Sequence, residues 1–394
     1  MACVHINIDD IRPGMYIVQT GISWRSRPYL YAKPGLIKSE KEIEAIAKQG
    51  YLEAYYDPEK SQKIIPRPND LLPRKPTAPA TPLIPLHEEL LIQNENYDNC
   101  VHQFTHVMEE ARSGHVDFHA AKPLIEDIIK SVNRNADALV SLSKIKTFDT
   151  YTFAHCVNVS IFAVSFGRHL GLEGETLRDL GMAGLFHDIG KMKVPLAILN
   201  APRKLTSSEY CSIQKHVDFS IDILSKTHGI DERIIQGVAD HHERFNGTGY
   251  PHGKIDTEIS PFGRILSICD VYDALSSRRV YKTALPPSQT LSIMYGMRDE
   301  AWESELLEHF IKMLGIYPVG TPIALTGGYK GIVVKSNTLA PLYPTVLLCK
   351  ERNGKKINPP TAVDLAKQHD FQIIKAIPAE EISTDIFSLL TCAQ

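Results

Sequence analysis

The sequence predicts a multidomain protein, with an all-α core between a small α+β N-terminal module and a small β-rich C-terminal appendage. Three observations support this fold class. Prolines crowd residues 58–86 and separate a short front segment from the rest. From 143 to 318, apolar residues recur at helical spacing and no alternating strand pattern interrupts them. After Pro318, short apolar runs are joined by Gly-Gly and Asn-Gly turns, which is typical of β-hairpins.

The composition is that of a globular protein with a small net charge. The 394 residues carry a net charge of -3, so no overall basic surface is available for duplex nucleic acid or an anionic membrane. The seven cysteines are scattered and form no Cys-x-x-Cys pair, which favours free thiols in a reducing compartment. The N-terminus lacks the pattern of a signal peptide, and no run approaches the length of a membrane span. We therefore expect a cytoplasmic protein.

Residues 1–57 predict the α+β module. Val4–Ile8 and Met15–Val18 indicate two strands around a Pro-Gly turn, and Tyr51–Tyr56 indicates a third. Between them, Ser39 and Glu42 have the spacing of a capping box, which predicts a helix that ends at a glycine.

Residues 58–86 predict a partly extended linker, since a packed helix could not hold so many prolines. Residues 87–142 predict a helical connector. Its His102 and His106 lie one turn apart, but no neighbouring carboxylate completes a metal site, so we expect surface or interface histidines.

Within the core, residues 143–318, several helix boundaries can be predicted. Thr206, Asp231 and Ser260 each have the features of an N-terminal cap, and Gly315 ends the last helix. The helix that begins after Thr206 is expected to carry a histidine, His216. Residues 319–394 then form the β-rich appendage.

The core contains more metal-competent side chains than packing explains. They are His155, His187, Asp188, His216, His241, His242 and Asp270. Imidazoles and carboxylates bind divalent Fe, Mn, Zn or Ni, and two ions bridged by a carboxylate promote displacement at phosphorus. One division consistent with the sequence places Asp188 between the two ions. In that division His155, His187 and Asp270 complete one ligand set, and His216, His241 and His242 complete the other.

These residues predict a phosphohydrolase in which the metal pair makes hydroxide from bound water, so that Asp188 and Lys191 are the catalytic candidates. Lys191 can contact a phosphate oxygen or the leaving alkoxide, or it can be a solvated lysine. Other candidates for substrate binding are Gly249, Tyr250 and Pro251 of a glycine-rich loop, whose tyrosine can stack on a base. Arg279 and Lys282 can clamp phosphate or can be ordinary surface cations.

Long ordered motifs give the core a family resemblance. His187-Asp188-Ile189-Gly190-Lys191, His216, the run 241–251 (HHERFNGTGYP) and Asp270-Val271-Tyr272-Asp273-Ala274-Leu275 resemble the bacterial HD-GYP family of the HD superfamily of metal phosphohydrolases. The resemblance covers roughly residues 145–318 and implies an HD-type helical catalytic core. It also implies hydrolysis of cyclic di-GMP to pGpG and onward to GMP, while some members act on 3',3'-cGAMP. The front module and linker resemble a domain of unknown function that often precedes HD-GYP domains.

The sequence departs from the family pattern at two positions. Tyr151 stands four residues before His155, where some members place a glutamate ligand for a third metal, so we predict two metals. Iron or manganese fits best, and nickel or zinc also suits such ligands. Asn246 stands where an aspartate is common, which keeps the turn chemistry and removes a charge.

Two alternatives to a cyclic di-GMP phosphodiesterase remain open. One is a signalling module that binds a cyclic dinucleotide with little turnover and relays its presence to partners. The other is a hydrolase that prefers another nucleotide, such as 3',3'-cGAMP. The N-terminal module carries no chemical motif, so we expect it to mediate homodimer formation or contact with signalling proteins.

Overall fold

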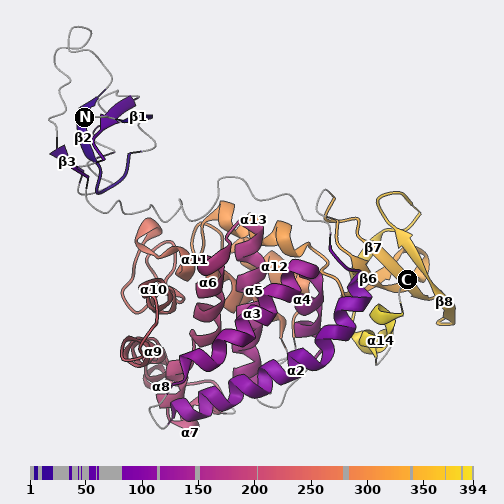
Figure 1. The fold of residues 1–394 in the computed structure, drawn as a ribbon. Coiled ribbons are helices and arrows are strands. Elements are labelled where there is room, and N and C mark those ends of the chain that lie inside the picture. Colours follow the sequence, from indigo (N-terminus) through magenta and orange to yellow (C-terminus); the bar gives the residue numbers. More distant parts are fainter. Residues whose placement is uncertain are drawn as a thin grey trace. The chain divides into compact units, whose positions relative to one another are not determined.

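The computed structural model (Figure 1) divides the protein into two compact units, residues 1–74 and 75–394. It describes residues 4–7, 11–20, 35–37, 43, 46, 53–58, 60–61, 82–112, 116–146, 151–201, 203–277, 284–337, 340–368, 370–382 and 385–392. Each unit has its own apolar core, and the predicted candidates for chemistry all belong to the second unit.

The first unit contains an antiparallel sheet with the strand order β1-β4-β2-β3. The strands are β1 (Val4–Asn7), β2 (Tyr16–Thr20), β3 (Gly35–Leu36) and β4 (Glu53–Tyr56). Buried Ile11, Met15, Ile17, Ile37, Ile43 and Ala54 form its core. The three predicted strands are confirmed, whereas the predicted capping box at Ser39 and Glu42 lies outside the described residues.

The second unit is mainly helical, as the sequence predicts. Its helical elements before the C-terminal sheet are α2 (Leu86–Ala111), α3 (Phe118–Arg134), α4 (Ala136–Ile145), α5 (Tyr151–His169), α6 (Gly174–Phe186), η3 (Ile189–Lys193), α7 (Leu196–Leu199), α8 (Ser207–Gln214), α9 (His216–Ser225), α10 (Glu232–Asp240), η4 (Asp256–Glu258), α11 (Pro261–Ser276), α12 (Pro287–Gly296) and α13 (Ser304–Leu314). Thr206, Asp231 and Ser260 cap α8, α10 and α11 as predicted.

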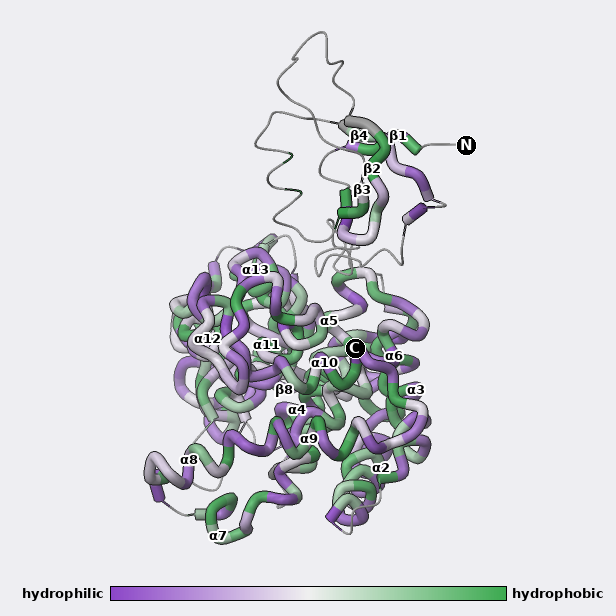
Figure 2. The backbone as a smooth tube through the Cα atoms, turned by 90° about the vertical axis from the view of Figure 1, so that its left-hand side faces the viewer, coloured by the Kyte–Doolittle hydropathy of each residue, from purple (hydrophilic) through white to green (hydrophobic). Residues whose placement is uncertain are grey.

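Helices α5 and α11 form the centre of this unit. Their side chains are buried on nearly every side, including those of Phe162, Phe166 and Tyr272. A helix that is apolar all round must be covered by other helices, and α2, α4 and α6 pack against α5. Along its length, the outer helix α2 mixes hydrophilic and hydrophobic residues (Figure 2). The site described below is built around this central pair.

Helices α2, α3 and α4, which correspond to the predicted connector, pack directly on the helical core. The buried carboxylate of Glu89 on α2 accepts two hydrogen bonds from the Arg134 guanidinium at the end of α3, at 2.6 and 2.8 Å. A planar guanidinium bound through two nitrogens fixes both partners in orientation. Helix α2 is therefore held as part of the helical core.

One predicted helix is interrupted. The sequence predicts that the helix after Thr206 continues through His216, but α8 ends at Gln214 and His216 begins α9. The backbone at Lys215 has ψ -10°, which breaks the helical hydrogen-bond ladder. The carbonyl of Ile213 accepts from the Lys215 N–H and also from His216 Nδ1, the latter at 2.7 Å.

The C-terminal region forms an antiparallel sheet with the strand order β8-β7-β6-β5-β9. Its elements are β5 (Pro322–Leu325), η5 (Thr326–Gly328), β6 (Lys330–Lys335), β7 (Thr345–Lys350), β8 (Lys356–Asp364), β9 (Ile373–Ala376), η6 (Ala379–Glu381) and α14 (Ile386–Thr391). This sheet confirms the predicted β-rich region. Among the described residues, no helix has the length and hydropathy needed to cross a membrane.

Candidate metal centre

Five helical elements bring the seven metal-competent side chains together. His155 projects from α5, His187 and Asp188 follow α6, His216 begins α9, His241 and His242 follow α10, and Asp270 lies on α11. Six of the seven are buried, and His242 is half-buried. Such a concentration of polar groups inside an apolar core requires compensating partners.

Close backbone packing brings η3, which follows Asp188, against the start of α9, which carries His216. A Cβ at Gly190 would lie 2.0 Å from the carbonyl oxygen of His216 and 2.5 Å from the amide nitrogen of Ser220, so only glycine allows η3 to lie against α9. The Gly190 N–H donates to Ser220 Oγ at 2.8 Å. Asp188 and His216 are therefore neighbours because no side chain separates their backbones.

Asp188 lies at the centre of the cluster. Its Oδ2 is 3.2 Å from His187 Nε2 and 3.8 Å from His155 Nε2. Its Oδ1 is 3.3 Å from His216 Nε2 and 4.0 Å from His241 Nε2. The two carboxylate oxygens therefore face two different groups of imidazoles, which is the arrangement expected of a bridging ligand.

The imidazoles are oriented by their other ring nitrogens. In His187, His216 and His241, Nδ1 bonds the carbonyl oxygen three residues earlier, at 2.8, 2.7 and 2.6 Å respectively. In His155, Nδ1 bonds Asp273 Oδ2 at 2.8 Å. These contacts fix the tautomer and direct Nε2 toward Asp188, as in metal sites where an outer partner orients each histidine.

Two buried atoms without hydrogen-bond partners show whether the cluster suits a metal ion. His187 Nε2 and Asp188 Oδ1 are both inaccessible to solvent and make no hydrogen bond within the described structure. Leaving such atoms unpaired is costly, whereas a cation would bind both. Two sets of potential ligand atoms converge and share Asp188, one with His155 and His187 and the other with His216, His241 and His242. The donor set therefore fits divalent metal ions.

Burial and charge set the protonation states of the cluster. Burial lowers the pKa of His216 to about 4 and that of His242 to about 3, so both rings are neutral at pH 7. Burial also opposes the charged form of His155, but hydrogen bonds to Asp270 and Asp273 outweigh it and raise its pKa to about 9. Burial raises the pKa of Asp188, yet His187 and Lys191 hold it well below its usual range. The anionic Asp188 carboxylate thus shares the cluster with the neutral rings of His216 and His242.

Lys191 lies at the open side of the cluster. Its ammonium contacts Asp188 Oδ2 and its side chain is 21% exposed, so the charge is near both the carboxylate and solvent. Burial alone would lower the pKa of Lys191, but Asp188 raises it, and the side chain stays cationic. A cation here can reach an anionic ligand that enters from solvent.

The glycine-rich loop 243–251 lies beside the same cluster. The Tyr250 ring is 4.7 Å from the His242 ring, centroid to centroid, with an interplanar angle of 32°. Buried Glu243 accepts backbone N–H bonds from His252 at 2.7 Å and Lys254 at 3.0 Å. A Cβ at Gly249 would lie 2.4 Å from the Arg244 nitrogen, so the loop folds tightly on itself. Tyr250 is therefore held over a predicted metal ligand.

The Asn246 departure has a structural role. Its side-chain oxygen accepts from the Thr248 N–H at 3.0 Å and from Thr248 Oγ1 at 2.7 Å, which closes an Asx-turn. Because only the oxygen acts, an asparagine serves this turn as an aspartate would.

Comparisons with known proteins agree with this geometry. The HD domain family matches residues 123–306, a domain of unknown function (DUF3391) matches residues 3–120, and a KOW domain associated with HD domains matches residues 323–385. A cyclic di-GMP phosphodiesterase of Pseudomonas aeruginosa is 30% identical over 383 residues, which covers 95% of this chain and 92% of that relative. The chain belongs to the HD-GYP family.

Other relatives of this HD-GYP protein match less than half of the chain. A 3'3'-cGAMP-specific phosphodiesterase of Vibrio cholerae is 34% identical over 168 residues, 43% of this chain and 36% of that relative. A cyclic di-GMP phosphodiesterase response regulator of Xanthomonas campestris is 32% identical over 201 residues, 49% of this chain and 52% of that relative. These shorter matches are thus to relatives that differ in their named substrates.

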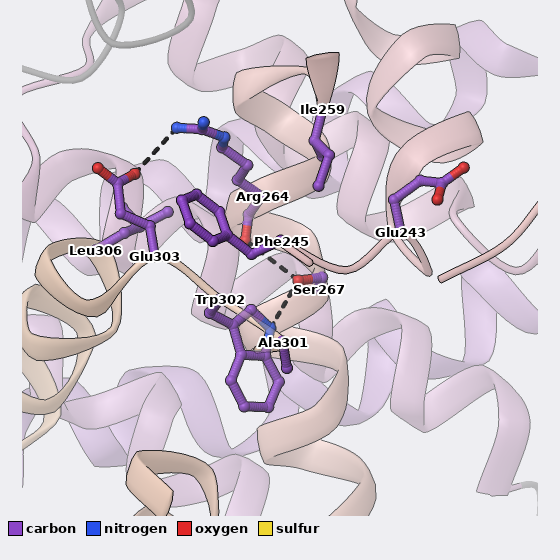
Figure 3. Close-up of a pocket in the computed structure, with 9 residues that line it drawn as sticks. All are labelled: Glu243, Phe245, Ile259, Arg264, Ser267, Ala301, Trp302, Glu303 and Leu306. Carbon is purple, nitrogen blue, oxygen red and sulfur yellow. Dashed lines mark hydrogen bonds and ion pairs between the residues drawn. The ribbon is translucent and has the colours of Figure 1, made fainter. Parts of the chain in front are cut away.

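In this HD-GYP protein a small pocket borders the loop and includes Glu243 and Phe245 in its lining (Figure 3). Its Arg264 guanidinium donates to Glu303 at 3.0 Å, and the Trp302 indole N–H donates to Ser267 Oγ at 2.8 Å. The Phe245 N–H donates to the Ala301 carbonyl at 3.1 Å. None of the seven metal-competent residues lines this pocket, and the Phe245–Ala301 hydrogen bond ties the loop to its wall.

Two predicted phosphate clamps of the HD-GYP core, Arg279 and Lys282, lie outside the described residues. The side chain of Tyr151 does so as well. Sequence reasoning gave no role to Asp273, which bonds His155 inside the site. Its position one helical turn after Asp270 was the available signal, because residues three apart share a helix face.

Proposed function

We propose that this HD-GYP protein hydrolyses cyclic di-GMP to linear pGpG and/or GMP at a centre of two divalent ions. The observation that carries the proposal is the pair of ligand sets that share buried Asp188, with His187 Nε2 and Asp188 Oδ1 left without partners. The cyclic di-GMP phosphodiesterase that matches nearly the whole chain supports the choice of substrate.

In this proposal His155, His187, Asp188 and Asp270 hold one ion, and Asp188, His216, His241 and His242 hold the other. Such ions, when bound, lower the pKa of bound water and polarise the phosphoryl oxygens. We expect iron or manganese, and nickel or zinc are also compatible with imidazoles and carboxylates. Asp188 keeps the two sites together, and the Nδ1 contacts of His155, His187, His216 and His241 keep these four imidazoles ready to bind without rearrangement.

Substrate binding is assigned to groups that border this centre. Lys191 would contact a non-bridging phosphate oxygen and balance the charge that develops there. Tyr250, held by Gly249 and Pro251 in the loop, would stack on a guanine base. Arg279 and Lys282 are proposed to bind the phosphates, since they follow the helix that carries Asp270.

A second candidate substrate is 3',3'-cGAMP, because two relatives that match 43% and 40% of this chain are named as specific for it. The two nucleotides differ in one base, so the contacts of the loop rather than those of the metals would discriminate between them. Competition between the two nucleotides for the same enzyme distinguishes these candidates.

We also propose a cytoplasmic location and an input role for the N-terminal module, through a homodimer or a signalling partner. All six described cysteines are free thiols, which supports a reducing compartment. The second unit alone contains the predicted chemistry, which leaves the N-terminal module available for contacts.

The test is to load metal-free protein with Mn²⁺ or Fe²⁺ under anaerobic conditions, add cyclic di-GMP and follow linear products by chromatography. We expect turnover by the native protein and loss of turnover in Asp188→Asn, while Asp222→Asn on the surface of α9 behaves as native. Tight binding of cyclic di-GMP without hydrolysis under either metal would support the signalling module and contradict the enzyme.

A further inference from the structure

Asp273 is the centre of a second buried polar cluster, behind the metal-binding side chains. Its Oδ2 accepts from His155 Nδ1 at 2.8 Å. Its Oδ1 accepts from Lys144 Nζ at 2.8 Å, Asn158 Nδ2 at 3.1 Å and Ser277 Oγ at 2.7 Å. The carboxylate is fully buried, so each of these donors compensates for the water it has lost.

This cluster continues to α2. Tyr97, which is 2% exposed, donates its hydroxyl proton to Asn158 Oδ1 at 2.5 Å. The resulting path runs from Tyr97 through Asn158 and Asp273 to His155, and joins α2, α5 and α11 by three hydrogen bonds. Every link is buried, so removing one leaves a polar group without a partner.

The path makes His155 different from the other imidazoles. His187, His216 and His241 are oriented by carbonyls three residues earlier in the chain, which move with the histidine itself. His155 is oriented by a side chain from another helix, and that side chain is held by groups on α4 and α5. Displacement of a neighbouring helix can therefore change the direction of the His155 ring alone.

Helix α2 is positioned to act in this way. It is the first described helix after the proline-rich segment, and the match to the front domain family extends to residue 120, beyond its end. Two ion pairs fix it to its neighbours, Glu89 with Arg134 and Asp98 with Lys146 at 2.6 Å. Tyr97 lies between these two ties, so its hydroxyl is placed by the packing of α2.

We propose that Tyr97 is a positioning residue that fixes the ring of His155 through Asn158 and Asp273, and so sets the metal affinity of the His155 subsite. This inference rests on the metal centre of the proposed function. Through this path, the position of α2 affects the metal affinity of the His155 subsite. The path does not reach the subsite of His216, His241 and His242.

The test is a Mn²⁺ titration of metal-free full-length protein, followed by calorimetry and by electron paramagnetic resonance. In Tyr97→Phe, which removes one hydroxyl and keeps the ring, one of two binding steps should weaken by roughly threefold to tenfold. Asp273→Asn should weaken the same step by roughly 10-fold to 100-fold, since Asp273 directly contacts the proposed metal ligand His155. The second step should keep its native affinity in both variants.

Ser165→Ala is the matched control. Ser165 is buried on α5, the helix of His155, and its hydroxyl has no hydrogen-bond partner within the described structure. Its removal should leave both binding steps unchanged. Circular dichroism and the urea midpoint of each metal-free variant show whether it is folded.

Two results would overturn the inference while the proposed function stands. These are two native binding steps in Tyr97→Phe, and an equal weakening of both steps, which would indicate a general structural role. A native protein that binds no Mn²⁺ would overturn this inference together with the metal centre.

Discussion

At the scale of single residues, the site depends on how each polar group is paired. The sequence predicts the seven metal-competent residues, because their types and order are visible in the motifs. It does not predict the partners of Nδ1, since a carbonyl three residues back carries no sequence signal. It also gives Asp273 no role, because one carboxylate beside another on a helix is common without function.

Lys191 provides a test of substrate contact. Lys191→Met keeps the length of the side chain and removes its charge, so phosphate would lose one stabilising group. We expect kcat for cyclic di-GMP to fall by roughly 100-fold or more while metal content stays native. Lys193→Met, on the exposed neighbouring lysine that pairs with Asp222, is the control. Native kcat in Lys191→Met would exclude this contact.

His155 provides a test by pH. Because its pKa is about 9, the ring is protonated at pH 7 in the metal-free protein, and a metal ion must displace that proton. Calorimetry in buffers of different ionisation enthalpy should therefore detect release of about one proton at pH 7. Affinity of the His155 subsite should rise with pH up to about 9 and then level off.

The same shift affects the metal-free fold. The pKa of His155 is raised above its unfolded value of about 6.5, so its stabilising contribution to the free energy of unfolding is fully present below that pH. It should be lost as pH rises through about 9, which urea unfolding of metal-free protein can measure. In the calorimetry test, metal binding at pH 7 without proton release would contradict the assignment of a protonated His155 ring in the metal-free protein.

At the scale of elements, the site is formed where helices end. Three of the five elements, α6, α9 and α10, present their ligands at or just beyond a helix terminus. The cap residues Thr206, Asp231 and Ser260 could be recognised in the sequence. The interruption at Lys215 could not, because neither the backbone angle of Lys215 nor the bond from the His216 ring to the Ile213 carbonyl has a local sequence signal.

Gly190 tests the contact between η3 and α9. A methyl group in Gly190→Ala would overlap the His216 carbonyl, so the two elements must separate. We expect the free energy of unfolding to fall by about 1–3 kcal/mol, with weaker metal binding. Gly296→Ala, at the end of α12 with no atom within 4 Å of its Cβ, should be neutral or slightly stabilising. Equal urea midpoints for the two variants would contradict this packing account.

Glu243 tests the loop. In Glu243→Gln one of the two backbone N–H groups of His252 and Lys254 would face an amide donor, and Tyr250 would lose its fixed place. An unpaired buried group costs about 1–3 kcal/mol, so KM for cyclic di-GMP should rise by roughly tenfold while metal binding persists. Glu232→Gln, on an exposed side chain of α10, should keep the native KM. A native KM in Glu243→Gln would separate the loop from substrate binding.

At the scale of the whole molecule, the sequence predicts the order of the domains but not every strand of the C-terminal region. Strands β5, β6 and β7 follow the predicted runs, whereas β8 contains Pro359 and Pro360, which argue against a strand. Prolines are tolerated there because β8 lies at the edge of the sheet. The convergence of the ligands likewise depends on how five elements pack, which local sequence patterns do not determine.

The central claim is that ligands from distant parts of the chain hold two ions with Asp188 between them. The most direct measurement is the anomalous diffraction of crystals of the full-length protein loaded with Mn²⁺. We predict two peaks about 3.5–4 Å apart on either side of the Asp188 carboxylate. One peak alone, or peaks that lie away from Asp188, would contradict the account.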